Sequence, residues 1–157
     1  MWVMPFKRQI PLGLLLLVVG GMIYVSFRPT SLLLFHSLDF LGLSAGVDAW
    51  RDLVSGWQPH EFIVYSLPGG LWAAAYILLT HGLLAYQPTT LRVGIASLIP
   101  LTGIGSELLQ RWGLLPGTFD IADLLCYAAP LLLLIIYEII KNKSIWQVSL
   151  TASPASN

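Results

Sequence analysis

Charged side chains are scarce in this chain of 157 residues, and cysteine is almost absent. Only 10% of the residues are charged, whereas soluble domains carry about 25%. The net charge is zero, so nothing in the composition indicates a nucleic-acid partner. Cys126 is the single cysteine, which excludes an intrachain disulfide. The sequence also lacks a Gly-rich phosphate loop, a Cys/His cluster and a Ser–His–Asp order.

Apolar residues, by contrast, make up 56% of the chain, and the mean hydropathy is +0.76. A single domain of this length cannot hide so much apolar surface from water. A lipid bilayer is therefore the expected solvent. We predict an all-α integral membrane domain over residues 1–147 and a disordered polar tail over residues 148–157.

Four segments approach the length of about 20 apolar residues that a membrane-spanning helix needs. These expected spans are Leu12–Phe27, Phe62–Leu84, Leu91–Leu109 and Ile121–Ile140. The first resembles the core of a signal peptide, but no small-x-small cleavage site follows it. We therefore expect a retained anchor and a bundle of four transmembrane helices.

Basic residues near the expected span ends predict the orientation. Lys7 and Arg8 precede the first span, and Lys141 and Lys143 follow the fourth. An even number of spans places both termini on one side, which the positive-inside rule makes cytoplasmic. We expect a protein integral to the cytoplasmic membrane, with both termini in the cytoplasm.

The link between the first two spans then lies outside the cell. Its stretch "VDAWRDLVSGW" places Val47, Trp50, Leu53, Val54 and Trp57 at helical spacing. This pattern predicts an external helix lying in the membrane interface. Such a helix is either a lid over an external site or an apolar connector that lies on the membrane, and we favour the connector.

Polar residues gather where the third span ends and the fourth begins. Glu107, Gln110 and Arg111 share one helix face because they are three and four residues apart. Asp120 and Asp123 open the fourth span at the same level. We interpret Asp120 as a helix N-cap. Glu107 and Asp123 are flanked by apolar residues, and ionisable groups at membrane depth usually mark a functional site.

Two further segments are expected to border these carboxylates. Tyr127 lies four residues after Asp123 and so shares its helix face. In the second span, Pro68 interrupts the helix and Trp72 lies one turn later, in the same outer half. Simple close packing through the small residues of "SLPGGLWAAAY" is an equally good interpretation of this segment.

The motifs resemble those of the VanZ-like family, small multi-helix membrane proteins associated with teicoplanin resistance. The matching residues are Pro68, Gly70, Glu107, Gln110, Phe119, Asp120, Ile121 and Asp123. The chain departs from the family pattern in having Gly117 where the family usually has arginine. It also has Tyr127 and Pro130 in place of an N-x-x-G motif. The resemblance implies an envelope or cell-wall lipid context rather than a particular reaction.

Two alternatives remain open. "FDIAD" is also similar to a segment of the lipoprotein signal peptidases, in which two aspartates activate water. That family's N-x-x-D-R motif is absent here, and Asp39 would have to supply the second carboxylate. The other alternative is a non-catalytic assembly subunit whose polar residues hold helices together. Glu107, Asp120 and Asp123 also offer the oxygen ligands that suit a hard cation.

We therefore expect an outward-facing acidic pocket that binds or acts on an envelope lipid or a lipid-linked cell-wall precursor. Its residues are Glu107, Gln110, Arg111, Asp120, Asp123, Tyr127, Pro68 and Trp72. We expect no cofactor and lean against an enzyme. Expected partners are membrane lipids and either a membrane protein or a second copy of the chain.

Overall fold

The computed structural model describes residues 6–151, and side chains from Arg8 to Asn142. It contains seven helices and no strand within these residues. They are α1 (Phe6–Phe27), α2 (Leu33–Phe40), α3 (Ser44–Val54), α4 (Glu61–Tyr65), α5 (Leu67–Leu83), α6 (Thr89–Arg111) and α7 (Ile121–Thr151). Helix α7 continues four residues into the expected tail, and residues 152–157 of that tail lie outside the described residues.

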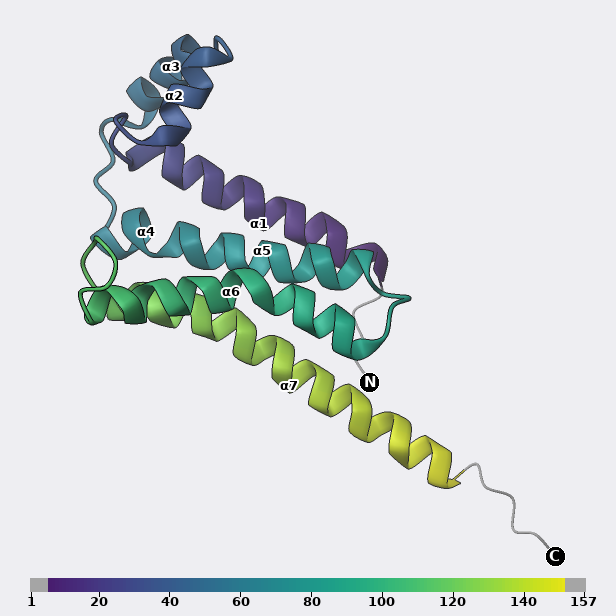
Figure 1. Cartoon of the computed structure of the whole chain (residues 1–157). Coiled ribbons are helices and arrows are strands. Elements are labelled where there is room, and N and C mark those ends of the chain that lie inside the picture. The colour runs from purple at the N-terminus through teal and green to yellow at the C-terminus, as the bar shows by residue number, and fades with distance from the viewer. Residues whose placement is uncertain (1–5, 152–157) are drawn as a thin grey trace, which may run out of the picture.

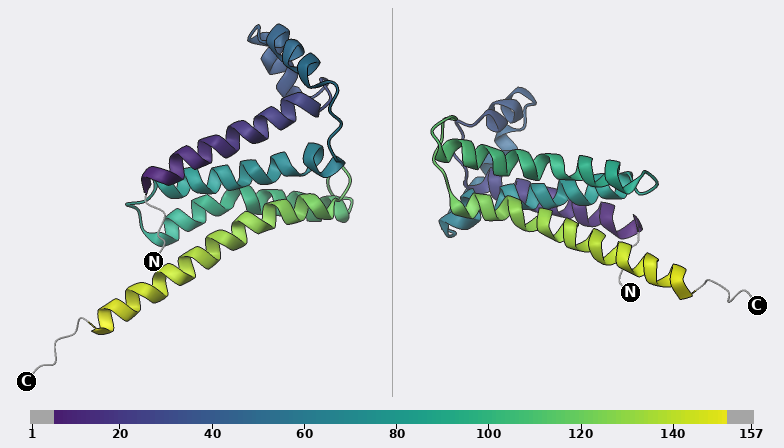
Figure 2. Two further views of the ribbon diagram at one scale, coloured as in Figure 1. Left: turned by 180° about the vertical axis from the view of Figure 1, so that it is seen from behind. Right: turned by 60° about the horizontal axis from the view of Figure 1, so that its bottom comes forward.

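Helices α1, α5, α6 and α7 run side by side and form one bundle (Figures 1 and 2). Helix α5 packs against each of the other three. The apolar core of the bundle joins Ile77 of α5, Ala96 of α6 and Leu134 of α7, all of them buried. Helix α1 begins beside the link between α5 and α6, and the described part of α7 runs past that link and projects from the bundle (Figure 1). We call the end of the bundle at this link the α5–α6 end and the opposite one the α6–α7 end.

Three helices are long and apolar enough to cross a membrane, namely Arg8–Phe27 in α1, α6 and Ile121–Asn142 in α7. The expected second span, Phe62–Leu84, is divided instead. Helix α4 ends at Tyr65 and α5 begins at Leu67, with Pro68 in its first turn. Proline favours the first turn because its missing N–H would have no partner there. The resulting α5 has 17 residues, fewer than the three spanning helices.

Glycines bring α1 and α5 close together. Helix α1 places Gly13 and Gly20 against α5, where an added Cβ would lie 2.8 Å from Leu79 Cγ and 2.7 Å from Trp72 Nε1. Gly82 of α5 faces Gln9 and Ile10 in the same way. Membrane helices associate largely through van der Waals packing, and small residues allow their backbones to approach. This interface is the most extensive in the bundle.

A proline and a glycine together explain the close approach of α5 and α7. Pro130 has no N–H, so it leaves the carbonyl of Cys126, one turn earlier, without its helical donor. A Cβ added at Gly70 would lie 3.1 Å from that same carbonyl oxygen. The absence of a side chain at Gly70 therefore lets the α5 backbone cover the freed carbonyl.

Helices α2 and α3 project from the bundle beyond the C-terminal end of α1 (Figure 1). Helix α3 forms where the sequence predicted an external interfacial helix, and it docks on α1. The indole of Trp50 donates a hydrogen bond of 2.8 Å to Ser26 Oγ. Leu53 and Trp57 remain exposed, at 81% and 62%. This apolar surface is compatible with a position at the membrane interface.

Candidate functional site

Glu107 and Asp120 are brought together at the α6–α7 end, as the sequence predicted from the short link between their helices. Glu107 lies in the last two turns of α6 and is 5% exposed. Its Oε2 accepts a hydrogen bond of 3.1 Å from the backbone N–H of Asp120. The Asp120 carboxylate in turn accepts from the N–H of Ala122 at 2.8 Å. Asp120 therefore caps the start of α7, and Glu107 fixes the residue that caps it.

Asp123 has no such partner. It lies in the first turn of α7, where its Oδ1 is buried and accepts no hydrogen bond from the described residues. Tyr127 follows one turn later and packs into a notch made by two glycines. A Cβ added at Gly103 would lie 2.6 Å from the Tyr127 ring, and one added at Gly69 would lie 2.9 Å from its hydroxyl. The ring thus fills the space between α5, α6 and α7, one turn of α7 after the residue with the unpartnered carboxylate oxygen.

Arg111 does not neutralise these carboxylates. Its guanidinium lies 5.1 Å from the centroid of the Phe119 ring. Within the described residues, the only ion pairs between side chains involve Glu138 at the other end of the bundle. Glu107, Asp120 and Asp123 therefore have no cationic partner in the part of the chain that the structure describes.

The link between α6 and α7 brings Gln110 back toward the chain at Gly117. A Cβ added at Gly117 would lie 2.9 Å from the Gln110 amide carbon. Gly117 also has φ of +130°, a backbone conformation that residues with a side chain rarely adopt. This explains why glycine occupies position 117.

Pro68 and Trp72 are the two expected site residues of α5. Pro68 is fully buried at the start of that helix. The Trp72 indole instead packs on α1, where Nε1 donates to the Leu17 carbonyl at 3.3 Å. Its ring also lies 5.2 Å from that of Tyr24. Trp72 thus joins α1 to α5, and within the described residues no hydrogen bond joins it to Glu107 or Asp123.

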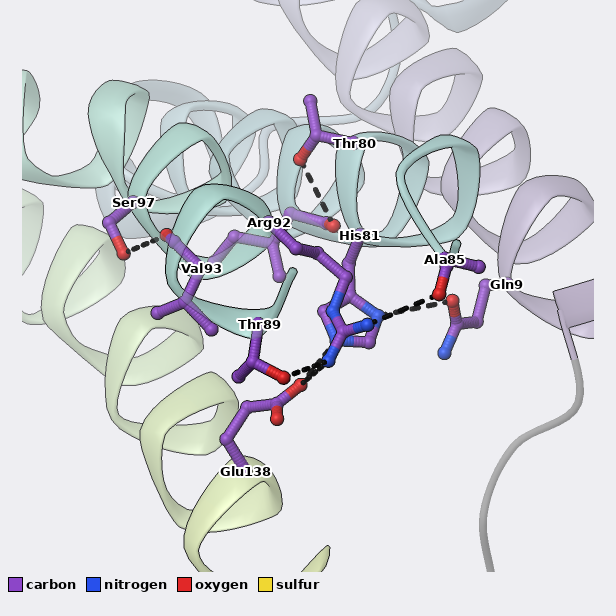
Figure 3. A network of polar contacts seen from close by, with 10 residues as sticks. Gln9, Thr80, His81, Ala85, Thr89, Arg92, Val93, Ser97 and Glu138 are labelled. Carbon is purple, nitrogen blue, oxygen red and sulfur yellow. Dashed lines mark hydrogen bonds and ion pairs between the residues drawn. The ribbon is translucent and has the colours of Figure 1, made fainter. Parts of the chain in front are cut away.

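A second polar cluster lies at the α5–α6 end and was missed by the sequence analysis (Figure 3). Glu138 of α7 is 6% exposed, and its Oε1 accepts from His81 Nε2 at 2.7 Å and from Arg92 Nη2 at 3.0 Å. Arg92 of α6 is 4% exposed and also donates to the Ala85 carbonyl at 3.3 Å. A buried charge is costly unless it is paired, so these contacts constrain three helices at once.

Gln9 extends the cluster to the fourth helix of the bundle. Its amide oxygen lies 3.3 Å from His81 Nδ1, and Gln9 itself is 6% exposed (Figure 3). Gln9, His81, Arg92 and Glu138 come from α1, α5, α6 and α7 respectively. Each helix of the bundle therefore contributes one buried polar side chain to this cluster. We call these four residues the four-helix network.

The charged residues of the chain are divided between the two ends of the bundle. Seven acidic and three basic residues lie toward the α6–α7 end, including α2 and α3, which gives a net charge of −4. Five basic residues and Glu138 alone lie toward the α5–α6 end, which gives +4. The five basic residues are Lys7, Arg8, Arg92, Lys141 and Lys143. An excess of lysine and arginine is typical of the cytoplasmic side of a membrane protein.

No three His, Cys, Asp or Glu side chains among the described residues lie close enough together to hold a metal ion. The carboxylates at the α6–α7 end therefore offer hydrogen-bond acceptors, but among the described residues they do not form a metal site with three such ligands. A hydrogen-bond donor or an ammonium group suits such acceptors.

No protein-family model, curated protein sequence or solved structure matches the chain. The likeness to the VanZ-like family therefore rests on the short motifs alone.

Proposed function

We propose that the chain is a membrane protein that binds an envelope lipid or a lipid-linked cell-wall precursor at the α6–α7 end. The observation that carries this proposal is the buried, unpartnered Oδ1 of Asp123. Leaving a buried acceptor without a partner costs about 1–3 kcal/mol, more when the group is charged. A ligand that supplies a donor at this position would recover that cost.

The charges around Asp123 favour a particular headgroup. Three carboxylates gather there without a basic partner within the described residues, because Arg111 stacks on Phe119. A headgroup that bears an amine, or one bridged by a cation, complements them better than a bare phosphate. The resemblance to the VanZ-like family supports the same envelope context.

The proposal includes four transmembrane segments, with α4 and α5 in series as the second. It also places the α6–α7 end outside the cytoplasm, which the division of charge supports. A cysteine scan in a Cys126→Ser background tests this orientation. An impermeant maleimide added to intact cells should label Thr118→Cys, and should label Gln87→Cys only after lysis. Both positions are exposed and lie in links at opposite ends of the bundle. The reverse pattern would disprove an outward site.

Native mass spectrometry on gently extracted protein tests binding. We expect the wild type to retain a lipid that Glu107→Gln and Asp123→Asn both lose while melting normally. Asp52→Asn is the matched control, because it removes an exposed carboxylate from the same end. Variants that melt far lower with unchanged lipid would instead identify the carboxylates as structural, as an assembly subunit would require.

A further inference from the structure

The bundle contains a lateral groove that the α6–α7 site does not use. It has a volume of about 420 Å³, within the range of small-molecule sites. Helix α5 forms its floor, and α1 and α7, which both pack on α5, form its walls. The lining residues are Gln9, Leu16, Ala74, Ile77, Leu78, His81, Pro130, Leu133, Leu134 and Tyr137.

The lining is polar at one end only. Leu16, Ala74, Leu133 and their neighbours are apolar, whereas Gln9 and His81 of the four-helix network lie at the α5–α6 end. The wall residue Leu133 is 67% exposed, so that in a bilayer the groove meets lipid directly. A groove with an apolar length and a polar end is complementary to an amphiphile.

The charge of the α5–α6 end selects the headgroup. Arg8 precedes Gln9, Lys141 follows Glu138 by one turn of α7, and Glu138 is already paired with His81 and Arg92. This end of the groove therefore has a local excess of positive charge, and its one carboxylate, Glu138, is engaged in ion pairs. Basic residues beside a membrane attract anionic lipids in the same way.

We infer that the groove between α1 and α7 binds a membrane lipid with an anionic headgroup. One acyl chain lies along Ala74 and Leu133, and the headgroup lies beside Gln9, His81 and Lys141. This inference rests on a bundle embedded in a membrane and is independent of ligand binding at Glu107 and Asp123.

The test uses the full chain in detergent, titrated with phosphatidylglycerol or phosphatidylcholine of identical acyl chains and followed by native mass spectrometry. We expect the wild type to retain one phosphatidylglycerol at concentrations where phosphatidylcholine is lost. Ala74→Phe fills the floor of the groove and should weaken this binding at least 10-fold. Ala129→Phe is the matched control, because Ala129 is exposed on α7 and does not line the groove.

A second pair of variants covers the case in which Ala74→Phe does not fold. Leu133→Asn makes an exposed wall position polar, and Leu132→Asn makes the same change at the preceding residue, which is also exposed and lies outside the groove. Only the first should lose the lipid. Lys141→Gln should reduce the preference for phosphatidylglycerol over phosphatidylcholine.

Three results would overturn the inference. The first is equal lipid retention by both members of each pair. The second is a wild type that does not distinguish the two headgroups. The third is a wild-type dimer that Ala74→Phe converts to a monomer, because the groove would then hold a second copy of the chain. Loss of lipid from Asp123→Asn, with the groove variants unaffected, would support the α6–α7 site alone.

Discussion

His81 Nε2 lies 2.7 Å from Glu138 Oε1, across the interface between α5 and α7 and with both side chains buried. Arg92 donates to the same oxygen, so that one carboxylate oxygen receives two donors from two helices. Glu138 Oε2 is buried and has no partner among the described residues. The stability of the bundle should therefore depend on this one carboxylate.

Glu138→Gln tests that dependence. The substitution keeps the shape of the side chain but leaves the buried Arg92 without its counter-charge. We expect the free energy of unfolding to fall by about 3 kcal/mol, as when one partner of a buried ion pair is removed. Thermal melting in detergent measures the change. Glu61→Gln removes an exposed carboxylate and should melt like the wild type. Equal melting of the two variants would contradict a structural role for the network.

The helices were largely predictable from sequence, because long apolar runs specify them locally. The runs at Leu12, Leu91 and Ile121 correspond to α1, α6 and α7. The contact between Glu107 and Asp120 could also be predicted, since a short link makes their helices neighbours. The four-helix network was not, because His81 and Glu138 are 57 residues apart and no local spacing pairs them. The available signal was Glu138 itself, an ionisable residue within an apolar span.

The α5 region was harder to predict for a different reason. Its composition reads as one apolar segment, so the sequence alone favoured a single span from Phe62. Pro68 was recognised as an interruption, but the consequence depends on where the helix restarts. The structure begins α5 at Leu67 and places the proline in its first turn, where it costs no hydrogen bond. Because the helix restarts at Leu67, the segment is divided into α4 and an α5 of 17 residues.

Gly103 should be essential for the position of Tyr127. A Cβ added at Gly103 would lie 2.6 Å from the Tyr127 ring, closer than packed atoms allow. We expect Gly103→Ala to destabilise the bundle by about 1–3 kcal/mol through overpacking. Gly105→Ala is the matched control on the same helix, since nothing lies within 4 Å of its added Cβ. In a double-mutant cycle, Tyr127→Leu should recover much of the loss caused by Gly103→Ala. Strictly additive effects on melting would place the strain elsewhere.

The two glycines of the α6–α7 link should tolerate asparagine differently. Gly113 has φ of +69°, in the left-handed region that asparagine enters readily, whereas Gly117 has φ of +130°. Gly117→Asn should therefore cost about 1–3 kcal/mol and displace Gln110, which its new side chain would meet. Gly113→Asn should melt close to the wild type. A larger loss for Gly113→Asn than for Gly117→Asn would refute this account of the link.

Arg51 should hold α3 on the bundle. Its Nη1 donates to the Val25 carbonyl at 2.7 Å and to the Arg28 carbonyl at 3.0 Å, at the end of α1 where carbonyls lack helical donors. Hydrogen bonds to charged groups contribute about 1.5–3 kcal/mol, so Arg51→Ala should speed amide hydrogen exchange in α3 by roughly 10- to 100-fold.

Exchange in α5 and α6 should not change, because α3 packs on α1 and α2. Asp48→Asn, which alters an exposed side chain of α3, should leave α3 as protected as in the wild type. Equal acceleration throughout the bundle would show that Arg51 supports the whole fold rather than the docking of one helix.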